Sequence, residues 1–198
     1  MRRLFAVLLA LWPLTAVADG FPALYDVIGV AADDVLNVRA GPGVANPIIA
    51  TLAPDRRDIE VLRLTADGAW GWVGLPEGNG WAAMRFLVRQ ETGIGVIPRP
   101  LRCLGTEPFW FVTLGFAGQN YATPEGSEPL ALVSEAVSDG GYLAFLADQQ
   151  GGSWSLTVAK ASCGDGMSDR DYGFAAHVFR QRKNGNDFLT GCCMLAGD

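Results

Sequence analysis

The chain has 198 residues, of which 49% are hydrophobic, 10% aromatic and 18% charged. Abundant apolar residues with modest charge exclude a coiled coil, a collagen-like repeat and a disordered polymer. The formal net charge of −6 argues against nucleic-acid binding, because affinity for phosphates depends on clustered Lys and Arg. The 25 Gly and 11 Pro, together with the aromatic residues, favour many short strands joined by tight turns.

The first 18 residues have the pattern of a secretory signal peptide. Arg2 and Arg3 precede an apolar run over residues 4–14, and residues 16–18 (AVA) give a small-x-small cleavage pattern. The run is shorter than the ~20 apolar residues that span a membrane, so we expect no stable membrane span after cleavage. Removing residues 1–18 leaves 13 basic and 21 acidic residues, a formal charge of −8. We predict a periplasmic or secreted bacterial protein.

Short runs of alternating apolar and polar residues predict strands in residues 19–90. Gly-rich turn signals separate them, among them residues 41–43 (GPG) and 78–80 (GNG). Five or six short strands in so few residues indicate a small barrel. The predicted strands are 25–30, 35–39, 48–52, 59–64, 70–73 and 80–83.

Residues 91–100 contain two Gly and two Pro and are predicted to be a linker, short enough for the flanking regions to pack together. The strand pattern then returns over residues 101–198, with hairpin signals such as Asn184-Gly185. An antiparallel meander that closes into a barrel leaves no exposed edge. The sequence therefore predicts an all-β protein, with strands in this region at 109–114, 130–137, 142–146, 154–160, 172–180 and 188–193.

All four cysteines lie in the second region, at Cys103, Cys163, Cys192 and Cys193. An even number in an exported chain favours two structural disulfides over a metal site. If residues 187–194 form a strand, Cys192 and Cys193 point to opposite faces and take different partners. The other possible pairing is a strained vicinal bridge that leaves Cys103 to pair with Cys163.

Four motifs in the first region resemble the signature of bacterial SH3 domains. They are residues 36–43 (LNVRAGPG), 71–73 (GWV), 80–82 (GWA) and 86–87 (FL), and the resemblance covers about residues 24–90. It implies an SH3-like small barrel that binds peptidoglycan or peptides in the cell envelope. We expect a ligand groove with exposed aromatic rings as anchors. Its candidate residues are Asn37, Arg39, Trp70, Trp72 and Trp81.

Three motifs in the second region resemble an uncharacterised family of bacterial envelope proteins, some of which are compared with small META-type or lysozyme-inhibitor-type barrels. They are residues 103–110 (CLGTEPFW), 163–170 (CGDGMSDR) and 191–193 (GCC). The resemblance implies a disulfide-stapled barrel of unknown activity. The motif residues, apart from the cysteines, are Thr106, Glu107, Phe109, Trp110, Asp165, Asp169 and Arg170.

For the polar residues of this region, a structural role is a stronger prediction than a catalytic one. His177 is the only histidine, and a single His on a strand face is typically an ordinary surface residue. Glu107 and Asp165 could form an acid–base pair, but no spacing brings them together. Asp165, Asp169 and Asp171 suggest a calcium loop, yet they lack the regular D-x-D-x-D-G spacing. We expect no enzyme activity, no metal and no cofactor.

The sequence therefore predicts a non-enzymatic binding protein of the cell envelope, whose partner is peptidoglycan or an envelope protein rather than nucleic acid. An alternative is an inhibitor or regulator of a periplasmic peptidoglycan hydrolase, because an acidic protein is attracted to a basic, lysozyme-like enzyme. A third possibility is a structural stress protein that acts only through its fold. The two leading hypotheses differ in their partner, a wall polymer or an enzyme.

Overall fold

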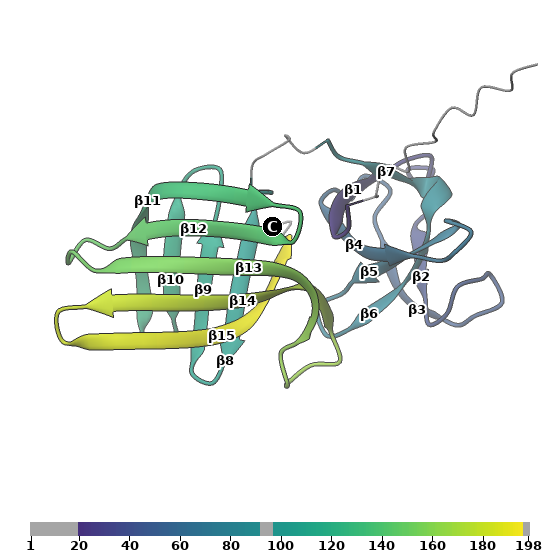
Figure 1. The fold of residues 1–198 in the computed structure, drawn as a ribbon. Helices are drawn as coiled ribbons and strands as arrows, with labels where there is room; N and C mark the ends of the chain where they lie inside the picture. The colour runs from purple at the N-terminus through teal and green to yellow at the C-terminus, as the bar shows by residue number, and fades with distance from the viewer. Residues whose placement is uncertain (1–19, 92–96, 196–198) are drawn as a thin grey trace, which may run out of the picture.

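The computed structural model describes residues 20–91 and 97–195, and these residues form an all-β structure with one 3-10 turn. The predicted signal peptide and half of the predicted linker, residues 92–96, lie outside them. Figure 1 shows a twisted sheet built from the first part of the chain beside a barrel built from the second. In the part of the chain that the structure describes, no helix has the length and apolarity needed to cross a membrane.

The first sheet has seven antiparallel strands in the order β3-β2-β6-β5-β4-β1-β7. All six predicted strands are present, with ends that differ by at most a few residues. A seventh, β7, follows the 3-10 turn η1 (Met84–Phe86) and was not predicted. The strands are β1 (Ala23–Val27), β2 (Leu36–Arg39), β3 (Ile48–Leu52), β4 (Ile59–Leu64), β5 (Trp70–Gly74), β6 (Asn79–Ala83) and β7 (Leu87–Arg89).

Alternation along these strands decides which side chains form the core of the sheet. Leu36 and Val38 of β2 are buried, whereas Asn37 and Arg39 lie on the opposite face. In β5, Val73 is fully buried and the flanking Trp72 is only half-buried. The face that carries the polar and aromatic residues is therefore available for binding wherever the barrel does not cover it.

The second part of the chain forms a closed antiparallel barrel of eight strands, as predicted. The six predicted strands are present, and two more, β8 and β10, complete the ring. The strands are β8 (Leu101–Thr106), β9 (Phe109–Leu114), β10 (Gln119–Thr123), β11 (Gly126–Ser138), β12 (Gly141–Ala147), β13 (Ser153–Gly164), β14 (Asp171–Arg182) and β15 (Gly185–Leu195).

Large side chains fill the inside of the barrel. Trp110, Trp154 and Phe174 are the largest of its fully buried residues, and the Tyr121 ring packs edge-on against Trp154 with 4.8 Å between centroids. Eight strands leave an interior that side chains can fill. Side chains therefore occupy the space in which a barrel could hold a ligand.

The sheet packs against one end of the barrel. Leu24 of β1 and Ile97 belong to the same buried cluster as the interior side chains of the barrel. The backbone N–H of Leu195, the last residue of β15, donates a 2.8 Å hydrogen bond to the Glu60 carboxylate of β4. Gly173 of β14 also lies so close to Pro22 that an added Cβ would be 1.9 Å from the proline Cγ. The two regions are thus in intimate contact.

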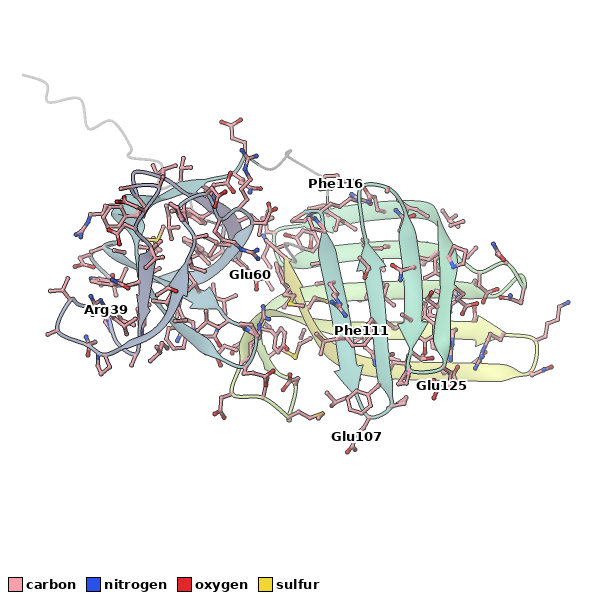
Figure 2. The ribbon with its side chains drawn as sticks, turned by 180° about the vertical axis from the view of Figure 1, so that it is seen from behind. Arg39, Glu60, Glu107, Phe111, Phe116 and Glu125 are labelled. Atoms are coloured by element: carbon pink, nitrogen blue, oxygen red, sulfur yellow. A yellow bond between two sulfur atoms is a disulfide. The ribbon has the colours of Figure 1, made fainter. Side chains whose placement is uncertain are left out.

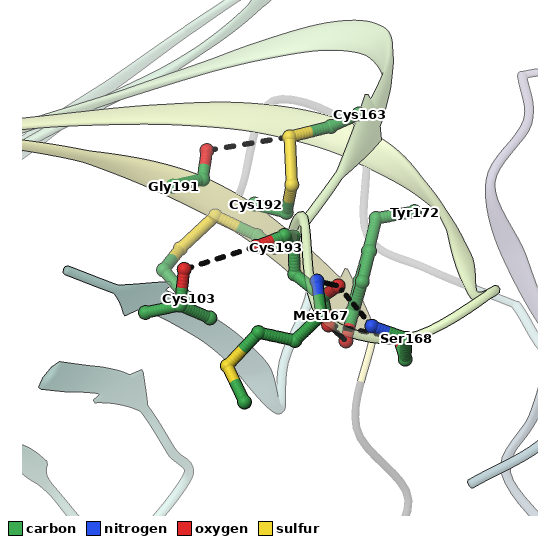
Figure 3. The surroundings of a disulfide bond; sticks show 10 residues. Cys103, Cys163, Met167, Ser168, Tyr172, Gly191, Cys192 and Cys193 are labelled. Atoms are coloured by element: carbon green, nitrogen blue, oxygen red, sulfur yellow. Dashed lines mark hydrogen bonds between the residues drawn. A yellow bond between two sulfur atoms is a disulfide. The ribbon is translucent and has the colours of Figure 1, made fainter. Parts of the chain in front are cut away.

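Two disulfides staple the barrel, and Cys192 and Cys193 take different partners, as their opposite directions on a strand predict (Figure 3). Cys193 faces the interior and bonds Cys103 of β8, across the seam that closes the barrel. Cys192 faces outward and bonds Cys163, at the end of β13. The first bridge therefore joins the ends of the barrel sequence, and the second holds the loop after β13 against its outer face.

Candidate functional site

Three of the five predicted groove residues line one pocket on the sheet. Asn37, Arg39 and Trp70 come from β2 and β5, and the pocket has a volume of about 420 Å³. Its other walls are the β1–β2 loop, the β2–β3 loop and the 3-10 turn, all of which contribute apolar side chains. We call this pocket the sheet groove; its other side-chain walls include Val30, Asp34, Val35, Val44, Arg85 and Phe86.

The sheet groove combines apolar, aromatic and charged groups. Val35 and Val44 are 41% and 70% exposed, so the rim presents apolar surface to solvent. Arg39 and Arg85 supply two positive charges against the one carboxylate of Asp34. Apolar walls with a few convergent polar groups are typical of ligand sites. The groove thus suits a ligand that has both apolar and anionic parts.

Short hydrogen bonds hold one rim of the sheet groove in place. Arg39 Nη1 donates to the carbonyl oxygen of Asn46 at 2.7 Å, and Asn46 Nδ2 donates to the carbonyl of Pro42 at 3.1 Å. Gly41 fits beneath the Asn46 side chain, where an added Cβ would be 2.7 Å from Asn46 Oδ1. The Gly-Pro-Gly motif thus serves to fold the β2–β3 loop back onto the arginine, which orders the wall before any ligand binds.

The other two predicted groove residues, Trp72 and Trp81, form a separate cross-strand pair. They lie opposite each other in β5 and β6, with 5.0 Å between ring centroids. The guanidinium of Arg63 lies over the Trp72 ring at 4.9 Å. The Trp72 indole Nε1 donates a 3.0 Å hydrogen bond to the Asp171 carboxylate of β14. Trp72 therefore fastens the sheet to the barrel, a role that the sequence did not reveal.

Asp171 is the centre of that contact. Its backbone N–H donates to Asn79 Oδ1 at 2.6 Å, and Asn79 Nδ2 donates back to its carbonyl oxygen at 3.3 Å. Its carboxylate also accepts a 3.5 Å hydrogen bond from Arg63. These bonds fix the first residue of β14 to three strands of the sheet, and they place the preceding Arg170 beside Glu60.

The motif residue Asp165 holds together the loop between β13 and β14. The Asp165 carboxylate accepts hydrogen bonds from the backbone N–H groups of Met167 and Ser168, both at 2.9 Å, and from the Tyr172 hydroxyl at 3.0 Å. Thr106 Oγ1 donates to the Asp165 carbonyl and ties the loop to β8. Burial alone would raise the pKa of Asp165, but the hydrogen bonds from Ser168 and Met167 outweigh it and lower the pKa to about 2.

The remaining motif residues are divided between core and surface. Trp110 is inside the barrel, and Gly105 makes room for it, because an added Cβ there would be 2.1 Å from the indole Nε1. Phe109 is 46% exposed, and Glu107 and Asp169 are exposed as well. Figure 2 shows Glu107 at the turn that ends β8. The structure thus does not bring these residues together into one site.

The catalytic and calcium hypotheses receive no support from the geometry. The His177 ring is exposed on the outer face of β14 and stacks on Phe188 with 5.7 Å between centroids. Asp165 is engaged inside its loop, whereas Asp171 faces Trp72 and the sheet. Across residues 20–91 and 97–195, no three His, Cys, Asp or Glu side chains lie close enough to hold a metal ion.

Glu60 is a buried carboxyl group that the sequence did not single out. Its side chain is 3% exposed, and Arg170 Nη2 lies 3.7 Å from its Oε2. Burial raises the pKa of Glu60 to about 7, against the opposing effects of the Leu195 N–H and the Arg170 charge. Alternation places Glu60 on the outer face of β4, so only the barrel packed against that face buries it. Figure 2 shows Glu60 on the side of the sheet that faces the barrel, and Arg39 on the far side.

Comparisons of the chain with protein-family models, with curated protein sequences and with solved structures find no match.

Proposed function

We propose that this chain is an exported, non-enzymatic binding protein of the cell envelope. In this proposal residues 1–18 are a signal peptide, residues 19–90 form a bacterial SH3-like module, and residues 101–198 form the disulfide-stapled barrel. The two disulfides support an oxidising compartment such as the periplasm. The module recognises peptidoglycan or a wall-associated peptide or protein.

The sheet groove carries this proposal. It gathers three of the predicted groove residues, Asn37 and Arg39 of β2 and Trp70 of β5, into one pocket of about 420 Å³. The half-buried Trp70 ring supplies a surface on which sugar or peptide groups can stack. Arg39 and Arg85 attract the carboxylates that peptidoglycan carries on its peptides. Recognition would therefore use aromatic contact and charge, with no bond made or broken.

Co-sedimentation with purified sacculi tests the proposal. The oxidised chain without residues 1–18 is expected to pellet with sacculi, and Trp70→Ala is expected to reduce the bound fraction by about tenfold, as for the loss of an aromatic anchor. Phe116→Ala is the matched control, because it removes an aromatic side chain that is 84% exposed on the barrel. Equal pelleting of all three proteins, or pelleting of none, would overturn the proposal.

A further inference from the structure

A second concave site lies between the sheet and the outside of the barrel. This cleft has a volume of about 830 Å³, within the range of small-molecule and peptide sites. One wall is formed by β3 and the start of β4, and the other by the outer faces of β8, β9 and β10. In the pairing of these strands, Thr113 of β9 lies opposite Asn120 of β10 on one side and Arg102 of β8 on the other. The sheet groove shares none of its lining residues with this cleft.

Two buried polar atoms belong to residues that line the cleft and have no hydrogen-bond partner among the described residues, although one of them lies 3.7 Å from Arg170 Nη2 in an ion pair. They are Glu60 Oε2, an acceptor, and Arg170 Nε, a donor. Glu60 is held by Leu195, and Arg170 is confined between Gly74 and the Tyr172 ring, which lies 5.0 Å from the guanidinium. Buried polar groups are nearly always paired, because an unpaired one costs about 1–3 kcal/mol. Because both atoms are shielded from solvent, the Glu60–Arg170 pair is a fixed part of the wall rather than a contact point for a ligand.

The wall formed by β3 offers backbone hydrogen bonds as well. β3 is at the end of the sheet order, with β2 as its only strand partner among the described residues. Four consecutive residues, 50–53, line the cleft. Successive side chains of a strand point to opposite faces of the sheet, so a cleft over one face would be lined by every second residue. Consecutive lining residues therefore indicate that the cleft borders the edge of β3. A free edge is a template for an added strand.

The charges in the cleft favour acidic groups. Arg56, Arg102 and Arg170 line it, whereas its carboxyl groups are Asp58 and the buried Glu60. Asp58 already accepts a 2.7 Å hydrogen bond from Gln90. Arg102 lies over the Phe111 ring at 4.4 Å, and neither Arg56 nor Arg102 has an ion-pair partner in the described part of the chain. In a protein with a net negative charge, this concentration of arginine stands out as an anion-binding wall.

We propose that the cleft binds an extended peptide with acidic side chains, which adds as a strand to the free edge of β3. Arg56 and Arg102 pair with its carboxylates. The proposal is independent of the sheet groove and of what that groove binds.

The test uses a displayed library of random peptides, panned against the full oxidised chain without residues 1–18. Ala122 lies on the outer face of β10 and lines the cleft, so Ala122→Trp fills it without touching the barrel core. The enriched peptides are expected to be acidic and to bind Ala122→Trp and Arg56→Glu at least about tenfold more weakly than the unaltered chain. N-methylation of their alternate amides is expected to abolish binding.

Matched controls separate occupancy of the cleft from general effects. Ala131→Trp adds the same bulk at an exposed position of β11 outside the cleft, and Arg57→Glu reverses the charge next to Arg56 without lining it. Both are expected to bind within about twofold of the unaltered chain. The proposal is overturned if no enriched peptide distinguishes Ala122→Trp from Ala131→Trp, or if chitotriose competes for the cleft. Sacculus binding that survives Ala122→Trp would leave the proposed function intact.

Discussion

Replacing Glu60 by Gln should stabilise the protein, and increasingly so as the pH rises. Glutamine has the shape of the protonated acid and keeps an oxygen to accept the Leu195 N–H. It removes the charge that burial opposes, since the carboxyl side chain is only 3% exposed. The Leu195 N–H and the Arg170 guanidinium, 3.7 Å away, favour that charge, and glutamine loses the attraction to the guanidinium.

The magnitude follows from the pKa of Glu60, which burial raises from 4.5 to about 7. The folded chain holds the proton more tightly than the unfolded chain, so folding takes up a proton between these two values. Stability therefore falls as the pH rises from 4.5 to about 7 and is level above that. At about 1.4 kcal/mol for each pH unit, the difference between Glu60→Gln and the unaltered chain should reach about 3 kcal/mol at pH 8 and vanish near pH 4.

Urea unfolding at pH 4, 6 and 8 with the disulfides intact measures this difference directly. Glu77→Gln is the matched control, because it removes an exposed carboxyl group and should leave stability unchanged across the series. The reasoning is refuted if Glu60→Gln is less stable than the unaltered chain at pH 8. That result would mean that the pair of Glu60 with Arg170 outweighs the cost of burying the charge.

Three further changes should affect stability in distinct ways. Replacing Cys163 and Cys192 together by Ser should lower the free energy of unfolding by about 3–4 kcal/mol, because that disulfide closes a loop with a sequence separation of 29. Urea unfolding measures the loss, and an unchanged free energy of unfolding would contradict a structural role for the disulfide. Asp165→Asn should be less stable than the unaltered chain above pH 4. This difference in stability should disappear as the pH falls towards 2, because the stabilisation that comes with a lowered pKa is lost when the carboxylate is protonated. A difference that stays constant during acid unfolding would contradict this role of Asp165. Gly191→Ala should lower the thermal midpoint and cost about 1–3 kcal/mol, because the new Cβ would be 1.9 Å from the Leu104 carbonyl oxygen; an unchanged midpoint would show that the strands can separate without cost.

Alternation was sufficient to predict most of the strands. Residues 109–114, 48–52 and 59–64 were predicted with the same ends that the structure shows. The three missed strands lack the pattern for a physical reason. β10 has a single large apolar residue, Tyr121, among polar neighbours, and β7 has only three residues. β8 follows the linker directly, so no turn signal marks where it begins.

The sequence could predict the candidate site only where its residues lie on one face of the same sheet. Asn37, Arg39 and Trp70 meet as expected because they share a face of the same sheet. Trp72 shares that face too, but its partner Asp171 is 99 residues away, and no local pattern indicates such a contact. Glu60 was missed for the same reason, since the barrel that buries it is remote in sequence.

The most direct test of the central claim is a titration of the isotope-labelled full chain with soluble peptidoglycan fragments, followed by amide and indole N–H chemical shifts. The chemical shifts are expected to change at the sheet groove, at Asn37, Arg85 and the Trp70 indole, and to stay unchanged at His177 on the outer face of the barrel. Changes confined to the barrel, or none at saturating fragment, would contradict the proposal that the sheet groove recognises the cell wall.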